Sequence, residues 1–220
     1  MSQPNGRRGG YPRPSLRERK KLATRAAIIR RAVHLFDQRG FHNTSIDDIA
    51  DAADVSRGTF FNYFGYKEAV IGEFGRDLLA ALAAAVAEQL AEKVSAERII
   101  YRIWLDVRAL LEEHGEAVVV LAHELLNPDG ERAGRAAQAF ALAELIAGVA
   151  SAGQAAGRLR GGLDAGQFGQ LVADVMIVSV ATQHRTGDEA GGEAAMRQSL
   201  DVLLHGAMPA GVAPANDRAV

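Results

Sequence analysis

The 220-residue chain contains no cysteine. Disulfide bridges, cysteine-containing zinc sites and cysteine nucleophiles are therefore excluded. Long apolar runs are also missing: the longest, residues 78–87 and residues 171–181, the second broken by Asp174, fall short of the ~20 residues that a transmembrane helix needs. The basic N-terminus is not followed by an apolar run, so no secretory signal is predicted. Together these absences favour a cytoplasmic protein with no membrane-spanning segment.

Signatures of catalysis are equally scarce. The sequence has no glycine-rich phosphate loop, no nucleophile elbow and no paired-carboxylate pattern. The nearest approach to a metal motif is the adjacent pair His123-Glu124. Neighbouring residues on a helix diverge by about 100°, so these two side chains would not share a face as metal ligands must. We therefore expect no cofactor and no metal.

The net charge of −2 conceals a strong asymmetry along the chain. Residues 1–70 carry 13 Lys and Arg against 7 Asp and Glu, whereas the remainder carries 12 against 20. A basic first third next to an acidic body indicates a polyanionic partner for the first third.

Residues 44–67, TSIDDIADAADVSRGTFFNYFGYK, have the pattern of two short helices joined by a tight turn. Ser45 can cap the first helix, with Asp47 and Asp48 favourably placed in its first turn. Ser56 can cap the second helix, in which the spacing of Phe60 and Phe64 turns both rings toward the core. Two capped helices this close together predict a helix-turn-helix.

The same stretch resembles the DNA-binding signature of the TetR/AcrR family of bacterial transcriptional regulators. The resemblance covers residues 22–75 and includes the preceding segment FDQRGF, residues 36–41. It implies an all-α fold in which a three-helix DNA-binding domain precedes a helical domain for ligand binding and dimerisation. Phe61 and Tyr66 depart from the residues common in the family, a tyrosine and a helix-capping residue respectively.

The outer face of the second helix is predicted to contact double-stranded DNA. Arg57, Thr59 and Asn62 are the candidates for reading base edges, while Thr44, Tyr63 and Lys67 are expected to contact phosphates. Gly58 allows a close approach of the backbone. The full predicted DNA-binding set is Thr44, Ser56, Arg57, Gly58, Thr59, Phe61, Asn62, Tyr63 and Lys67.

The domain boundaries follow from the pattern of helices and breaks. Residues 1–14 are predicted to be a disordered basic arm, either a DNA contact or a solubilising tail. Residues 15–67 form the DNA-binding domain, and its first helix, residues 15–40, has an apolar stripe of Leu22, Ile29, Val33 and Phe36. Residues 68–207 form the body, with helices expected at 68–93, 96–113, 116–126, 131–157, 164–183 and 192–205. Residues 208–220 are predicted to be a disordered tail.

The body is expected to bind a small apolar or amphipathic effector. Trp104, Arg108, His123, Phe140 and Met176 are the candidate pocket residues. For Trp104, His123, Phe140 and Met176, a place in the plain core is the more common alternative for such a residue. The resemblance implies a homodimer formed by the last two helices. The candidate interface residues are Leu171, Val175, Val178, Leu200 and Leu203.

Three functions remain open on the sequence. The first is a dimeric, ligand-responsive regulator, with repression expected, on a pseudopalindromic operator. The second is a dimeric DNA-binding protein without an effector, and the third is an all-helical enzyme. A cavity in the body would separate the first from the second.

Overall fold

The computed structural model describes residues 15–126, 134–186 and 189–207. Within these ranges the chain forms nine helices and no strand, which confirms the all-α prediction. The predicted arm and tail, residues 1–14 and 208–220, lie outside the described residues. The helices are α1 (Leu16–Arg39), α2 (Ile46–Ala52), α3 (Arg57–Tyr63), α4 (Lys67–Ala91), α5 (Ala96–Glu113), α6 (Gly115–Leu126), α7 (Gly134–Ala155), α8 (Ala165–Thr186) and α9 (Glu189–Ala207).

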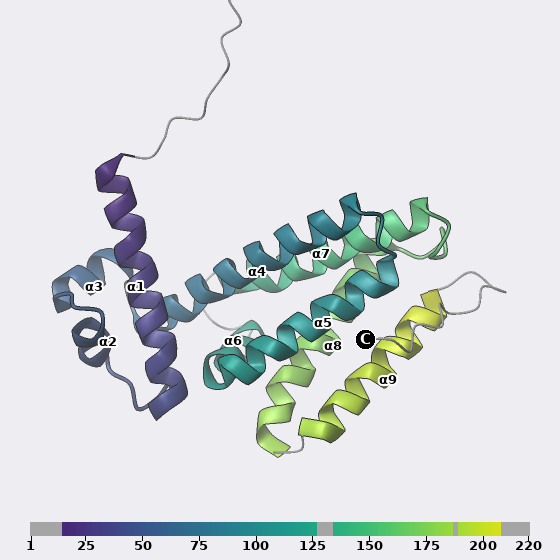
Figure 1. The fold of residues 1–220 in the computed structure, drawn as a ribbon. Helices are drawn as coiled ribbons and strands as arrows, with labels where there is room; N and C mark the ends of the chain where they lie inside the picture. Colours follow the sequence, from purple (N-terminus) through teal and green to yellow (C-terminus); the bar gives the residue numbers. More distant parts are fainter. Residues whose placement is uncertain (1–14, 127–133, 187–188, 208–220) are drawn as a thin grey trace, which may run out of the picture.

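Helices α1–α3 form a head at one end of the molecule, and α4 leads from this head into a body made of α5–α9 (Figure 1). The side chain of Arg25 on α1 forms an ion pair with Glu73 on α4, across the junction of head and body. The long α4 therefore belongs to both parts, as expected for the predicted connecting helix.

Local capping sets the ends of α1. Ser15 caps its N-terminus in a capping box with Glu18, and the helix ends at Gly40, whose φ of +83° suits glycine. Ile29, Val33 and Phe36 are buried as predicted. Leu22 is 60% exposed, so its assignment to the buried stripe was wrong. The first residues of α1, 16–23, are all exposed.

The body helices agree with the sequence prediction to within a few residues, as helix ends usually do. Helix α5 matches its predicted range, and α4 begins one residue early, at Lys67. Tyr66 provides no side-chain cap for α4, in line with its departure from the family pattern. Helices α8 and α9 extend three residues beyond their predicted near ends, so only a short connection separates them.

Helices α7 and α8 approach each other closely in the middle of the body. A Cβ atom at Gly169 would lie 2.4 Å from the carbonyl oxygen of Ala143 and 2.7 Å from the amide nitrogen of Ala147. Glycine at this position therefore permits the contact. It places α8 at the centre of the body, where Val172 and Met176 are buried.

Helix α8 also contains an apolar window, Ala165–Thr182, long and apolar enough to cross a membrane by length and composition. Of this window 44% is buried inside the chain. A single such helix is weak support for a membrane span, because the central helix of a helical body has the same composition.

Helix α9 lies on the outside of the body, against α8 (Figure 1). The hydroxyl of Tyr101 on α5 donates a hydrogen bond to the carboxylate of Asp201 on α9. Burial, and then this hydrogen bond, raise the pKa of Tyr101 above its ordinary value. This contact ties α9 to a second helix of the body.

Candidate nucleic-acid interface and body cavity

Serine caps position the two short helices of the head. Ser45 and Asp48 form a capping box at the start of α2, in which the Ser45 amide donates to Asp48 Oδ2 at 2.8 Å. The Ser56 hydroxyl accepts a hydrogen bond from the Thr59 amide at 3.0 Å and so caps α3. Asp54, between the helices, has a φ of +53°, which turns the chain sharply. These contacts build the predicted helix-turn-helix.

Two phenylalanines hold α3 against the head. Phe60 and Phe64 are buried, with ring centroids 5.6 Å apart, as their spacing predicts. The opposite face of α3 is open: Ser56, Arg57, Gly58, Phe61 and Asn62 are exposed, whereas Thr59 and Tyr63 are half-buried. Seven of the nine predicted DNA-binding residues therefore gather on or beside one accessible face of α3.

Arg57 has contacts that the sequence analysis missed. Its Nη1 atom lies 2.6 Å from Asp47 Oδ2 on α2, and its guanidinium carbon lies 5.6 Å from the centroid of the Phe61 ring. The carboxylate and the ring thus restrain the side chain that is the leading candidate for a base contact. The ten-residue separation of Arg57 and Asp47 shows no periodicity that would have revealed the pair.

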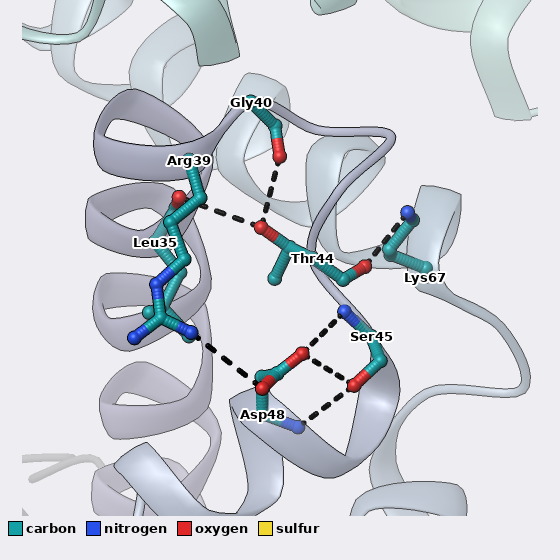
Figure 2. A network of polar contacts seen from close by, with 7 residues as sticks. All are labelled: Leu35, Arg39, Gly40, Thr44, Ser45, Asp48 and Lys67. Atoms are coloured by element: carbon teal, nitrogen blue, oxygen red, sulfur yellow. Dashed lines mark hydrogen bonds and ion pairs between the residues drawn. The ribbon is translucent and has the colours of Figure 1, made fainter.

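The structure corrects the prediction for Thr44. This residue is 1% exposed, and its hydroxyl lies 2.9 Å from the carbonyl oxygen of Gly40 and 3.4 Å from that of Leu35 (Figure 2). A side chain this deeply buried cannot reach a phosphate. Thr44 instead donates to the carbonyl of Gly40, which follows α1 and has no partner within the helix, and lies near that of Leu35 in its last turns.

Lys67 likewise binds within the head. Its ammonium group donates hydrogen bonds to the carbonyl oxygens of Phe41 and Thr44, at 2.5 and 2.9 Å (Figure 2 shows the second). Burial lowers the pKa of Lys67 below its ordinary value. We replace the predicted phosphate contact by a structural role in which Lys67 holds the loop between α1 and α2 against the start of α4.

A reciprocal pair of hydrogen bonds joins the head to the start of α6. The Phe41 amide donates to Glu116 Oε1 at 3.0 Å, and the Ala117 amide donates to Asp37 Oδ1 at 3.4 Å. His114 Nδ1 lies 3.4 Å from Asp37 Oδ2. We call the contacts of Asp37 and Phe41 with His114, Glu116 and Ala117 the junction clasp.

One face of α6 lines a cavity of about 90 Å³ in the body. Helices α4–α8 all contribute to its wall, which consists of apolar side chains and one glycine. The lining residues are Gly75, Leu78, Leu79, Leu82, Val107, Leu110, Val118, Leu121, Ala122, Leu125, Leu142, Met176, Ile177 and Val180.

Among the predicted pocket residues, Met176 lies in this wall. The other candidates whose side chains are described lie outside this wall. Trp104 is buried in the core, Arg108 pairs with Glu112, and His123 is exposed on α6. The side chain of Phe140 lies outside the described residues. The wall comes from small and aliphatic residues, which no single sequence position distinguishes from ordinary core.

The predicted dimer residues fall into two groups. Leu171 and Val178 on α8 are 48% and 45% exposed, and Val175 between them is half-buried. These three residues form an apolar strip on the surface. Leu200 is fully buried in the core of its own chain, so its assignment to an intersubunit contact is corrected; Leu203 is half-buried.

Comparison with known families matches both parts of the chain. Residues 28–74 match the family described as bacterial regulatory proteins, tetR family. Residues 76–206 match the C-terminal domain of TetR/AcrR family transcriptional repressors. The two matches divide at Gly75, within α4, the helix that joins head and body.

Individual proteins are similar over different lengths. The HTH-type transcriptional regulator TcmR of Streptomyces glaucescens is 42% identical over 69 residues, which are 31% of this chain and 27% of that protein. The HTH-type transcriptional repressor KstR2 of Rhodococcus jostii is 25% identical over 84% of this chain and 92% of its own. The structure of Thermus thermophilus FadR, a TetR family transcriptional repressor in complex with lauroyl-CoA, is 34% identical with a TM-score of 0.68. It covers 87% of this chain and 98% of that one.

Proposed function

Because this chain belongs to the TetR/AcrR family of transcriptional regulators, we propose that it is a ligand-responsive repressor that binds a pseudopalindromic operator as a homodimer. Members of this family are DNA-binding regulators, not enzymes, so the enzyme hypothesis is set aside. The proposed repressor acts in the cytoplasm. The operator, the dimer and the effector are each supported by separate features of the chain.

The observation that carries DNA binding is the open face of α3. Phe60 and Phe64 hold the helix while Arg57 and Asn62 stay accessible, as a recognition helix in a major groove requires. Ser56 and Tyr63 flank these residues, where they would reach the phosphate backbone of the DNA. In a dimer, two copies of α3 would enter successive major grooves about 34 to 36 Å apart.

The apolar strip on α8 supports dimerisation. Leu171, Val175 and Val178 lie on one side of α8. The exposed Leu171 and Val178 would stabilise the protein by burial only when a partner covers them. Pairing two copies of α8 and α9 would bury the strips against each other. A fixed dimer then makes the second half-site contact intramolecular, which strengthens operator binding.

The body cavity supports an apolar effector or an amphipathic one with a long apolar part. Its wall offers no charged or polar side chain, so the bound part of the ligand would be hydrocarbon-like. The similar Thermus thermophilus FadR was solved with lauroyl-CoA, and this supports an acyl chain as the apolar part.

The small size of the cavity suggests how binding would reach the head. Ligand pockets usually measure about 300 to 1,000 Å³, so a chain of drug-like size would have to push the packed helices apart. Helix α6 contributes Val118, Leu121, Ala122 and Leu125 to the wall, and the junction clasp holds its first turn. Displacement of α6, together with a tilt of α4, would move the two heads out of register with the operator.

The test begins with selection of tight-binding duplexes from a random DNA library by the native protein. Lauroyl-CoA, dodecanoic acid and a panel of apolar metabolites are then titrated by calorimetry with and without the selected duplex. An effector must bind the free protein more tightly than the DNA-bound one, because equal affinity shifts no equilibrium. A tenfold release of DNA corresponds to about 1.4 kcal/mol, and the duplex must weaken the ligand by the same factor.

The alternative of a dimeric DNA-binding protein without an effector makes the opposite prediction. Ligands that bind equally in both titrations are not effectors. If the panel gives no binding at all while the selected duplex binds tightly, the effector-free function takes its place. Failure to select any preferred duplex would contradict both.

A further inference from the structure

Arg57 is restrained from two directions in the chain. Its Nη1 atom is 2.6 Å from Asp47 Oδ2, and its guanidinium carbon is 5.6 Å from the ring centroid of Phe61. The side chains of Arg57 and Asp47 are 61% and 58% exposed. Both charges therefore lie on the face of the head that would meet DNA.

The ion pair contributes little to the stability of the fold. Exposed pairs of this kind are typically worth about 0.2 to 1 kcal/mol, and salt screens them. Helix α2 has its own capping box at Ser45 and Asp48, and α3 has its cap at Ser56, so neither helix depends on the pair. The remaining effect of Asp47 is on the orientation and charge of the Arg57 side chain.

We propose that Asp47 determines sequence selectivity by holding Arg57 away from phosphates, so that Arg57 binds DNA only where a guanine replaces or shares the contact. A guanidinium has five N–H donors, and Asp47 engages a single nitrogen. The other nitrogens remain available for the O6 and N7 acceptors of guanine. This inference rests on the proposed function, because it presupposes that the face of α3 reads DNA.

Asp47 acts differently on the two kinds of DNA. On a random sequence, a free arginine would turn to the nearest phosphate and add affinity without selectivity. The Asp47 carboxylate competes for that arginine and also repels the phosphate. On the operator, the bidentate contact of Arg57 with guanine compensates for the contact with Asp47 that Arg57 gives up or shares. Asp47 therefore lowers the affinity for random DNA more than the affinity for the operator.

Phe61 restricts the same side chain from within α3. It is four residues after Arg57, so the two side chains lie on one face of the helix. The exposed ring offers the guanidinium a weak cation–π contact. The ring of Phe61 therefore keeps a use at this position, although it lacks the phosphate-binding hydroxyl of the tyrosine that is common in the family.

Asp51 provides a matched control. It is exposed on α2 one turn after Asp47, so both carboxylates share a face, but Asp51 does not contact Arg57. Asp47→Asn and Asp51→Asn remove the same charge from the same helix. A difference between them isolates the contact with Arg57 from the general loss of negative charge.

The experiment compares the native protein with both variants on a duplex selected by the native protein and on a scrambled duplex, over a range of salt concentrations. Asp47→Asn should raise the affinity for the scrambled duplex about 1.4- to 5-fold, the equivalent of an exposed ion pair. Its slope of log K against log salt on that duplex should steepen by about 1, because Arg57 gains a phosphate. Asp51→Asn should change the affinity for both duplexes by the same factor. In an Arg57→Ala background, Asp47→Asn should no longer alter selectivity.

Equal behaviour of Asp47→Asn and Asp51→Asn would overturn the inference while leaving the proposed function intact. Failure to select any preferred duplex would overturn both. Circular dichroism checks that each variant is folded. If Asp47→Asn is not, Asp47→Ser, which also suits the first turn of a helix, replaces it in the same comparison.

Discussion

The side-chain nitrogen of Lys67 lies 2.5 Å from the carbonyl oxygen of Phe41 and 4.3 Å from the centroid of the same residue's ring. One cation therefore contacts both the backbone and the side chain of the residue that follows α1. The loop between α1 and α2 is fixed to α4 through this lysine, which explains how a residue outside the helix-turn-helix can control its position.

Replacing Lys67 should affect stability more than DNA contacts. We expect Lys67→Ala to lower the free energy of unfolding by about 1.5 to 3 kcal/mol, because hydrogen bonds from a charged group are lost. Lys67→Met keeps the apolar stem over Phe41 and should therefore lower the free energy of unfolding less than Lys67→Ala does. Chemical denaturation measures both. The salt slope of DNA binding should stay unchanged, and a fall of about 1 would restore Lys67 as a phosphate contact.

Thr44 is expected to act through the same loop. Thr44→Val leaves the carbonyl groups of Leu35 and Gly40 without their hydroxyl partner and should cost about 1 to 3 kcal/mol. Thr44→Ser keeps the hydroxyl and serves as the control. Thermal unfolding compares the two variants. Equal stability of the valine variant and the native protein would show that the buried hydroxyl contributes nothing.

The acid stability of the head should depend on the capping box of α2. Hydrogen bonds from the side chain and then the backbone of Ser45 lower the pKa of Asp48. The capping box therefore stabilises the head fully when the pH is above the pKa of Asp48 in the unfolded chain, about 3.9. This stabilisation is lost as the pH falls through the lower pKa of Asp48 in the folded chain. Ser45→Ala should raise the pKa of Asp48, as measured by NMR titration. Ser56→Ala, whose cap involves no carboxylate, should leave that pKa unchanged.

The strip on α8 makes a direct prediction about assembly. Leu171→Glu with Val178→Glu should yield folded monomers, because two buried charges in each chain would face the partner without compensation. Sedimentation velocity measures the oligomeric state. Leu22→Glu alters a leucine on α1 that is more exposed than Leu171 and should leave the dimer intact. Dimers that survive the double substitution on α8 would place the interface elsewhere.

The junction clasp should control the response to an effector. Asp37→Asn with Glu116→Gln removes the charged acceptors of the two hydrogen bonds that join the head to α6. We expect the affinity for lauroyl-CoA, or for whichever compound binds in the calorimetric panel, to change little. The factor by which that ligand weakens DNA binding should fall toward 1. An unchanged factor would mean that coupling passes through α4 alone.

Features that depend on neighbours in the sequence were predicted well. Ser45 and Ser56 cap α2 and α3 as predicted, and each accepts a hydrogen bond from an amide three residues further on, so both caps are specified by the local sequence. Phe60 and Phe64 are buried because their spacing puts both rings on one face of α3. The pocket was predicted poorly, because its wall of leucines, valines and alanines looks like any other core.

The sequence by itself therefore determined the helices, their caps and the family, since these depend on hydrogen bonds and apolar spacing within a few residues. Only the tertiary structure decided which polar groups find partners across the chain. Thr44 and Lys67 carry donors that suit a phosphate equally well, but the loop between α1 and α2 offers them the carbonyl groups of Gly40 and Thr44, which lie outside both helices. Arg57 and Asp47, and Asp37 and Ala117, meet only once the helices pack. Their pairing depends on the distances that folding creates, which no local pattern records.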